Sequence, residues 1–196
     1  MLLWRDMSVV DLLKKNKIIV YPTDTLYGIL GRALSKRVVE RIYRVKGRDE
    51  NKPFIILISS ISDLKKFNIS DALIRANGGI LERVWPGPVS VILPCISKKF
   101  LYLHRGTKGL AFRMPKDKEF LRILNTTGPL VAPSANPQGE IPASNIKKAR
   151  KYFENKIDGY YGRKKRAGKP STIISLIDVK PKIIRQGVKK VVLTSF

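Results

Sequence analysis

Small polar side chains follow an apolar run near the start of the chain. In VYPTDTLYGILG, residues 20–31, two threonines, an aspartate and a tyrosine stand between a proline and two glycines. A backbone turn needs only one or two such residues, so the additional hydroxyls indicate contact with a ligand. The alternative is a capped turn in which Tyr27 only fills the core. Asp24 fits both interpretations, because a carboxylate can accept a hydrogen bond from an amine or close the turn.

Polar residues follow two further apolar runs in the same manner. AFRMP (111–115) and VAPSAN (131–136) each combine an expected strand with a proline and polar side chains, as VYPTDT (20–25) does. In open α/β sheets, loops at the carboxyl ends of strands converge over one crevice. We therefore expect the three segments to form one ligand site.

Familiar catalytic motifs are incomplete in this chain. GRKKRAGKPST (162–172) has five residues between its glycines where a P-loop has four, and Pro170 stands where the metal-binding hydroxyl belongs. GILG (28–31) is not the G-x-G-x-x-G dinucleotide fingerprint. Ser134 has no evident triad, because the only histidine is His104. We therefore expect catalysis by positioning and electrostatics, without a covalent intermediate.

The composition is that of one α/β domain. The chain has 196 residues, 43% of them hydrophobic, which is enough for one full-sized core. A single cysteine, Cys95, and a single histidine, His104, exclude an internal disulfide and an ordinary zinc site. No apolar run approaches the roughly 20 residues that cross a bilayer, and the early charges argue against a signal peptide. We expect one domain over 1–196, a cytoplasmic location and no membrane contact.

The charge is strongly positive. The chain has 39 Lys and Arg against 15 Asp and Glu, a formal net charge of +24. Such an excess favours a polyanionic partner, either nucleic acid or nucleotide phosphate. The alternative is a solvated, lysine-rich surface. The densest cluster is RKKR at 163–166, which is expected in a loop where it shields the site or touches tRNA.

Hydrophobic periodicity predicts strands and helices that alternate along the chain. The expected strands are 17–22, 54–59, 89–94, 110–115, 129–134, 171–177 and 182–186. The expected helices are 8–16, 36–47, 70–85, 117–128 and 144–153. Ser8 is placed to cap the first helix and Gly47 to end the second. The fold class is therefore α/β, with one compact mixed sheet.

Five motifs in order resemble the YrdC/Sua5 family, the threonylcarbamoyl-AMP synthases. They are YPTDTLYG, KGR with NKP, APSAN with a nearby glycine, STII, and RQG near the end. The resemblance covers residues 8 to about 190 and is to the short YrdC form, without the additional C-terminal domain of Sua5 proteins. It implies a YrdC-like single domain: a twisted, open, mixed β-sheet flanked by helices, with a basic concave cleft.

The resemblance also implies a reaction. The family condenses L-threonine, bicarbonate or carbon dioxide, and ATP into threonylcarbamoyl-adenylate, with release of pyrophosphate. Mg²⁺ is expected to accompany ATP as cofactor. A downstream tRNA threonylcarbamoyltransferase complex is the expected partner, because it passes the group to an adenosine beside the anticodon. The implied location is the cytoplasm.

Individual residues receive roles from the same resemblance. It assigns to L-threonine the residues Thr23, Thr25, Tyr27, Arg113 and Ser171. It assigns to ATP the residues Lys46, Arg48, Lys52, Ser134, Asn136 and Arg185. Lys46 and Arg48 are also expected to be catalytic, and no residue is assigned to a metal. Without the resemblance, Lys46 and Arg48 are cations at a helix end, and Ser134 and Asn136 are caps of a helix or turn.

The chain departs from the family's pattern at three positions. Asp49 stands where many relatives carry proline, which affects the shape of its loop. Gly109 stands where many carry threonine, so a polar contact is expected to be missing. Gln186 replaces the proline of R-P-G, and we expect a looser loop.

Two other functions are weighed against this one. The first is a module that binds double-stranded RNA or tRNA during RNA or ribosome maturation, although RNA backbone binding does not require the PTDT and STII hydroxyls. The second is carbamoyl transfer, as in hydrogenase maturation proteins that contain a YrdC-like module. Those proteins carry acylphosphatase-like and zinc-finger segments, and this sequence has neither the length nor the cysteines for them.

Overall fold

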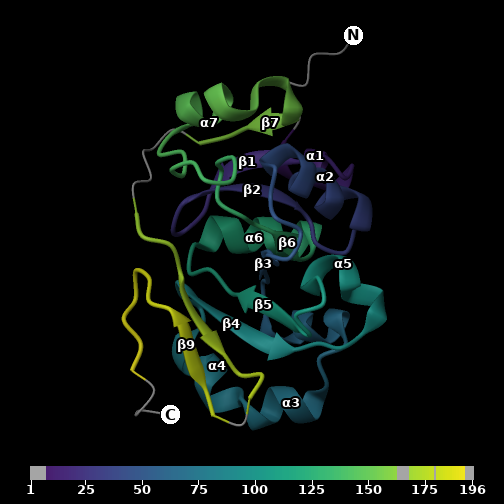
Figure 1. Ribbon diagram of the computed structural model, residues 1–196, viewed down its shortest axis with the longest axis vertical. Helices are drawn as coiled ribbons and strands as arrows, with labels where there is room; N and C mark the ends of the chain where they lie inside the picture. The colour runs from purple at the N-terminus through teal and green to yellow at the C-terminus, as the bar shows by residue number, and fades with distance from the viewer. Residues whose placement is uncertain (1–7, 163–167, 179, 193–196) are drawn as a thin grey trace.

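The computed structural model describes residues 8–162, 168–178 and 180–192 (Figure 1). These residues form one open, mixed sheet with helices packed against it, as the sequence predicts. The order of strands across the sheet is β7-β1-β2-β6-β3-β5-β4-β8-β9. The strands are β1 (Ile19–Pro22), β2 (Tyr27–Arg32), β3 (Ile55–Leu57), β4 (Val89–Pro94), β5 (Gly109–Arg113), β6 (Leu130–Val131), β7 (Gly159–Tyr160), β8 (Thr172–Ser175) and β9 (Lys182–Arg185). The basic cluster 163–166 lies outside the described residues.

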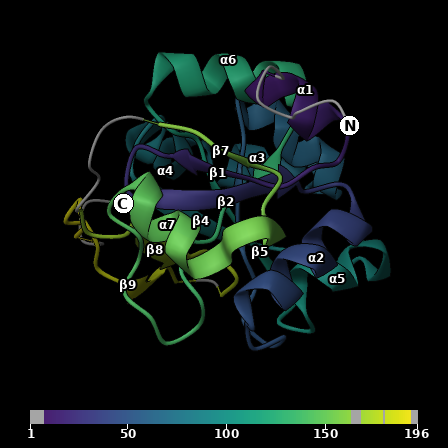
Figure 2. The ribbon, with the colours of Figure 1, turned by 90° about the horizontal axis from the view of Figure 1, so that it is seen from above.

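Helices on opposite sides of the sheet bury two hydrophobic clusters (Figure 2). The α-helices are α1 (Val9–Lys14), α2 (Lys36–Lys46), α3 (Asp71–Ala76), α4 (Gly78–Val84), α5 (Leu101–His104), α6 (Lys118–Thr127) and α7 (Ile146–Phe153). The 3-10 helices are η2 (Ile61–Phe67), η3 (Lys98–Phe100) and η4 (Glu154–Lys156). In the smaller cluster, Leu12 of α1 and Phe120 of α6 pack with Ile19 of β1. Across the described part of the chain, every helix is too short or too polar to cross a membrane.

Local sequence signals set several helix ends. The hydroxyl of Ser8 accepts a hydrogen bond from the amide of Asp11 at 3.1 Å, which confirms the predicted cap of α1. Asp117 caps α6 in the same way, through the amide of Phe120 at 2.9 Å. Gly47 adopts φ 57° and ends α2, as predicted, because glycine reaches the left-handed region without steric cost.

Several elements differ from the sequence prediction, among them η2, α5 and β7, for which no element was predicted. The helix expected over 70–85 is divided into α3 and α4, because Asn77 leaves helical geometry before the Gly78–Gly79 pair restarts the helix. The segment Tyr27–Arg32, which received no strand in the prediction, is β2 and forms a hairpin with β1. Its two glycines obscured the strand pattern, since glycine is disfavoured in strands.

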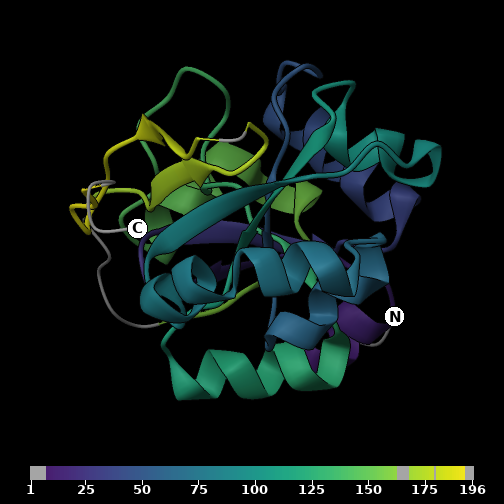
Figure 3. The same cartoon turned by 90° about the horizontal axis from the view of Figure 1, so that it is seen from below.

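Strand register brings the predicted polar segments to one region. The β1–β2 hairpin pairs Pro22 with Tyr27, so residues 23–26 form its turn. Gly28 of β2 forms a bridge with Ser134, and Leu57 of β3 pairs with Arg113 at the end of β5. The two C-terminal strands, in yellow, complete one edge of the sheet (Figure 1 and Figure 3). The loops predicted to converge therefore do so through pairing of strands that are distant in the sequence.

Candidate active site

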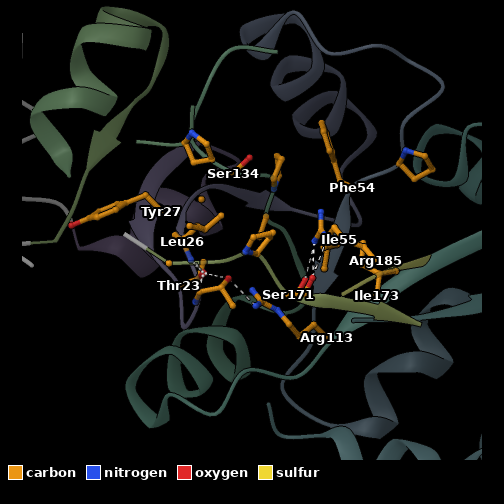
Figure 4. Close-up of a pocket in the computed structure, with 18 of the residues that line it drawn as sticks. Thr23, Leu26, Tyr27, Phe54, Ile55, Arg113, Ser134, Ser171, Ile173 and Arg185 are labelled. Carbon is orange, nitrogen blue, oxygen red and sulfur yellow. Dashed lines mark hydrogen bonds between the residues drawn. The ribbon is translucent and has the colours of Figure 1, made fainter. Parts of the chain in front are cut away.

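A cavity of about 470 Å³ opens where these loops meet (Figure 4). Among the residues predicted for the site, those that line it are Thr23, Thr25, Tyr27, Arg48, Arg113, Ser134, Ser171 and Arg185. The remaining three, Lys46, Lys52 and Asn136, lie outside the lining. The structure thus gathers side chains from six separate segments around one space, although 162 residues separate Thr23 from Arg185.

The hairpin turn at residues 23–26 is built by one hydroxyl. The Oγ1 of Thr23 donates to the carbonyl of Leu26 at 2.7 Å. The same oxygen accepts from the amides of Thr25 at 3.2 Å and Leu26 at 3.3 Å. Thr23 therefore shapes the turn, and the hydroxyl of Thr25 is the one that reaches toward another segment of the cavity.

Arg113 is the partner that Thr25 reaches. It is 3% exposed at the last position of β5, and its Nη1 donates to Thr25 Oγ1 at 2.9 Å. Nη1 also lies 3.1 Å from Oδ1 of Asp24. Burial lowers the pKa of the Arg113 guanidinium and Asp24 opposes the shift. Asp24 sits in the turn, outside the lining, and its carboxylate pairs with a cation that lines the cavity.

Arg48 and Arg185 are two further cations in the lining of the cavity. Arg48 donates from Nε to the carbonyl of Lys52 at 2.8 Å and lies 5.2 Å from the ring centroid of Phe54. Arg185 donates from Nη2 to the carbonyl of Ser171 at 2.9 Å. Partial burial lowers the pKa of Arg185, and the charge of Arg48 lowers it further. Two guanidiniums that repel each other across a cavity make a favourable site for an anion.

Lys46 is buried beside the cavity. Its side chain donates from Nζ to the carbonyl of Ser134 at 2.5 Å and to the carbonyl of Asn136. Burial is the larger cause that lowers the pKa of Lys46 to about 7, and the charge of Arg48 adds to the shift. In this structure, Lys46 contacts the loop that carries Ser134 and does not itself line the cavity.

The other two predicted residues outside the lining have local roles. The side chain of Lys52 is 59% exposed, and its ammonium lies 3.4 Å from the carboxylate of Asp49. Asn136 donates from its amide group to the carbonyls of Pro137 at 2.9 Å and Glu140 at 2.7 Å. These bonds fold the loop after β6, which agrees with the interpretation of Asn136 as a residue that stabilises a turn.

Tyr27 and Ser171 occupy opposite walls. Tyr27 is fully buried, and in Figure 4 its ring points away from Arg113 and Ser171. Its hydroxyl lies against Gly162, where a Cβ would come within 2.9 Å of it. The hydroxyl of Ser171 lies 3.0 Å from that of Ser90. Tyr27 therefore has the packing role that the sequence left open, while it still contributes to the lining.

The described residues contain no group of three or more His, Cys, Asp and Glu side chains suited to a metal ion. Asp24, the carboxylate in the hairpin turn, is paired with Arg113. Mg²⁺ prefers several oxygen ligands and commonly binds through substrate phosphates. The residues present therefore do not fit a metal site built by the protein.

The sequence analysis missed the apolar part of the lining. The apolar residues in the wall are Leu26, Pro53, Phe54, Ile55, Ala132, Pro133, Pro142, Pro170 and Ile173. Four of them, Leu26, Pro53, Pro133 and Pro170, are direct neighbours of residues predicted for the site. Apolar walls with few polar groups are usual in ligand pockets, so this adjacency is the signal that would have found them.

Two expectations about departures from the family's pattern need correction. A side chain at Gly109 would meet Ile177 and Ile92 instead of the cavity, so threonine at this position is not a missing contact of the site. Gln186 holds its loop through its side chain, which donates to the carbonyl of Val191 at 2.8 Å and accepts from its amide at 3.3 Å. The side-chain bridge offsets the loss of proline.

Comparisons with known proteins agree with this geometry. The Sua5_yciO_yrdC family model, described as "Telomere recombination", matches residues 11–187. A threonylcarbamoyl-AMP synthase of Pyrococcus abyssi is 29% identical over 186 residues, 94% of this chain and 54% of that protein. A threonylcarbamoyl-AMP synthase of Bacillus subtilis is 32% identical over 181 residues, 90% of this chain and 51% of that protein. The chain thus spans about half the length of these curated relatives.

Solved structures match the same fold. Sua5 of P. abyssi complexed with L-threonine has a TM-score of 0.81 and 30% identity, and the match covers 91% of this chain and 52% of that chain. YciO of E. coli has a TM-score of 0.78 and 25% identity, over 92% of this chain and 88% of that chain. Both matches therefore cover more than nine-tenths of this chain.

Proposed function

The chain belongs to the Sua5/YciO/YrdC family, and from this premise we propose that it is an L-threonylcarbamoyladenylate synthase. The reaction joins L-threonine, bicarbonate or carbon dioxide, and ATP into threonylcarbamoyl-AMP, and it releases pyrophosphate. Two relatives carry the name threonylcarbamoyl-AMP synthase, and a solved relative holds L-threonine. The product serves a downstream complex that modifies tRNA.

The observation that carries the proposal is one cavity whose lining offers two kinds of polar group, which we assign to an amino-acid end and a nucleotide end. Thr25, Arg113 and Ser171 offer hydroxyls and a guanidinium, which suit the hydroxyl and carboxylate of an amino acid. Arg48 and Arg185 offer paired positive charges, which suit the phosphates of ATP. An enzyme that joins an amino acid to a nucleotide needs both ends within reach of each other.

The chemistry requires no nucleophile from the protein. The threonine amine captures carbon dioxide as a carbamate, and a carbamate oxygen attacks the α-phosphorus of ATP. The bond between the α-phosphorus and its bridging oxygen breaks, and pyrophosphate leaves. Arg48 and Arg185 neutralise the negative charge that develops on the leaving group. Arg113 and Thr25 orient threonine so that its carbamate faces the nucleotide.

Mg²⁺ belongs to this reaction as the counterion of the nucleotide. It supplies additional charge neutralisation on the phosphates. Because the described residues offer no carboxylate cluster, the guanidiniums would bind the nucleotide, and Mg²⁺ would enter with its phosphates.

A pyrophosphate-release assay tests the proposed function. Pyrophosphate is expected from ATP only when L-threonine and bicarbonate are both present, and isotope-labelled threonine is expected to appear in an adenylate product. Omission of each substrate in turn is the control. Turnover that does not depend on threonine would refute the assignment.

A further inference from the structure

Lys46 combines burial with an absence of counterions. It is 3% exposed, and its ammonium is bound by the carbonyls of Ser134 and Asn136. Within the described ranges, no carboxylate lies within ion-pair distance of this ammonium. A buried cation that is held only by neutral dipoles remains electrostatically unsatisfied. Its charge is therefore available to respond to an anion that arrives nearby.

The carbonyls that Lys46 binds belong to one loop, residues 134–138. Two further bonds join this loop to the end of α2: the amide of Gln138 donates to the carbonyl of Lys46 at 2.9 Å, and the amide of Asp49 donates to Oε1 of Gln138 at 2.8 Å. One hydrogen bond donated by the loop and one donated to it therefore join the loop to the segment that carries Arg48.

The same loop and the residue before it are also bonded to β2. The amide of Ala135 donates to the carbonyl of Tyr27 at 2.8 Å, and the amide of Ile29 donates to the carbonyl of Pro133 at 2.8 Å. The 134–138 loop is therefore bonded both to β2, which follows the hydroxyl-bearing turn, and to the segment that carries Arg48. A group that fixes this loop helps to fix the relative position of these two segments.

We propose that Lys46 is a positioning residue that clamps the 134–138 loop to the end of α2, and that a nucleoside triphosphate bound beside Arg48 strengthens this clamp by stabilising the ammonium. The inference rests on the proposed function for its second half. It gives Lys46 a role through Ser134 and Arg48, without direct contact between Lys46 and the nucleotide.

The charged groups around Lys46 make the clamp sensitive to a bound anion. Burial, as the larger cause, and the charge of Arg48 together lower the pKa of Lys46 to about 7. The 134–138 loop adds carbonyls and no ionisable side chain. The carboxylate of Asp49 faces the amide of Asn51 and the ammonium of Lys52. A polyanion bound at Arg48 offsets the repulsion between Arg48 and Lys46 and favours the charged form of Lys46, so that binding takes up a proton.

Hydrogen exchange of the free protein tests the clamp without any ligand. Lys46→Met is expected to speed exchange of the Gln138 amide by about tenfold or more, since the loop loses both side-chain bonds. Arg44→Met is the matched control, because Arg44 is an exposed residue of the same helix turn, and it is expected to leave this exchange unchanged. Unchanged exchange in Lys46→Met would overturn the clamp.

Calorimetry of ATP binding by the unmodified protein tests the coupling, even where Lys46→Met fails to fold. Binding enthalpies in two buffers of different ionisation enthalpy are expected to give close to one proton taken up per ATP at about pH 8 and almost none at about pH 6. Lys46→Arg, which stays charged, is expected to abolish the uptake. No uptake at pH 8, or equal uptake in Lys46→Arg, would overturn the coupling. Failure of the protein to bind ATP would instead contradict the proposed function and leave the exchange result standing.

Discussion

The buried guanidinium of Arg113 depends on partners from one turn. Asp24 and Thr25 both contact its Nη1, at 3.1 Å and 2.9 Å. Removal of one member of a buried ion pair costs about 3 to 5 kcal/mol, because the remaining charge stays buried without compensation. The turn and the end of β5 therefore stabilise each other, and the same contacts aim Arg113 at the cavity.

We expect Arg113→Ala to raise the KM for L-threonine by about tenfold or more, with a smaller effect on the KM for ATP. The physical reason is the loss of a charge-assisted hydrogen bond, worth about 1.5 to 3 kcal/mol, from the amino-acid end of the cavity. Steady-state kinetics with each substrate varied in turn provides the measurement. Thermal unfolding of the double variant with Asp24→Ala separates loss of fold from loss of binding. A larger effect on ATP than on threonine would reverse the assignment of the two ends.

The lowered pKa of Lys46 makes the free energy of unfolding depend on pH. Its pKa is about 7 in the folded protein and about 10.4 in an unfolded chain. Between these values the unfolded chain binds more protons, so the free energy of unfolding rises with pH by about 1 kcal/mol per unit. We expect the unfolding free energy of the natural protein, relative to that of Lys46→Met, to rise by this amount per unit between about pH 7.5 and 9. Urea unfolding at several pH values measures it, and a difference independent of pH would contradict it.

The edge strand β9 is positioned by the segment that follows it. The amide of Gly187 donates to Oγ1 of Thr172 at 2.9 Å, and the amide of Val188 donates to the carbonyl of Pro170 at 2.9 Å. These bonds, with the side-chain bridge from Gln186 to Val191, fix the C-terminal segment across β8. Because these bonds hold the segment against the sheet, Arg185 stays within hydrogen-bond distance of the carbonyl of Ser171.

Gly187→Ala is expected to destabilise the protein by about 1 to 3 kcal/mol and to weaken ATP binding. A Cβ at this position would overlap the backbone of Pro170 and Ser171 and lie 2.5 Å from the amide nitrogen of Thr172, so β9 would have to move away from β8. Urea unfolding and the KM for ATP are the measurements.

Gly79→Ala is the matched control for that substitution. Gly79 lies in α4, and an added Cβ meets no atom within 4 Å. Alanine favours the helix by about 1 kcal/mol over glycine, so this variant is expected to be as stable as the natural protein or more so. Equal destabilisation by both variants would show that close packing is not the cause at Gly187.

The net positive charge of the whole molecule greatly exceeds the charge of the cations that line the cavity. The formal net charge is +24, whereas the cations in the lining are Arg48, Arg113 and Arg185. Exposed basic residues such as Lys147 and Lys151 of α7 lie elsewhere. Among the described residues, most of the positive charge therefore lies outside the cavity, where it would favour a polyanionic partner.

Salt is expected to separate the two kinds of binding. An RNA held by six to ten phosphate contacts loses about 10³ to 10⁵ in affinity between about 50 and 200 mM salt. The KM for ATP is expected to change by less than about tenfold over this range, because few charges in a partly buried cavity are involved. Filter binding of tRNA and kinetics at matched salt are the measurements. An equally steep response of both would place the nucleotide on the open surface.

Most polar groups of the cavity belong to short motifs that are visible in the sequence. PTDT, KGR, APSAN and STII contain residues that carry the hydroxyls and cations of one cavity. The helix ends at Ser8 and Gly47 were also predictable, since caps and left-handed glycines are local effects. The glycine-rich β2 was not, because its stability comes from pairing with β1 and β6.

The sequence by itself thus determined the fold class, the family and the set of polar groups, because these depend on periodicity and on residue types in order. Only the tertiary structure decided how those groups are shared between binding and support. It turned Thr23 and Asn136 into turn builders, set Lys46 behind the cavity wall and left Thr25, Arg113, Arg48 and Arg185 around the space. The physical reason is that a side chain's free hydrogen-bonding capacity depends on neighbours distant in the chain, and these neighbours exist only once the sheet has formed.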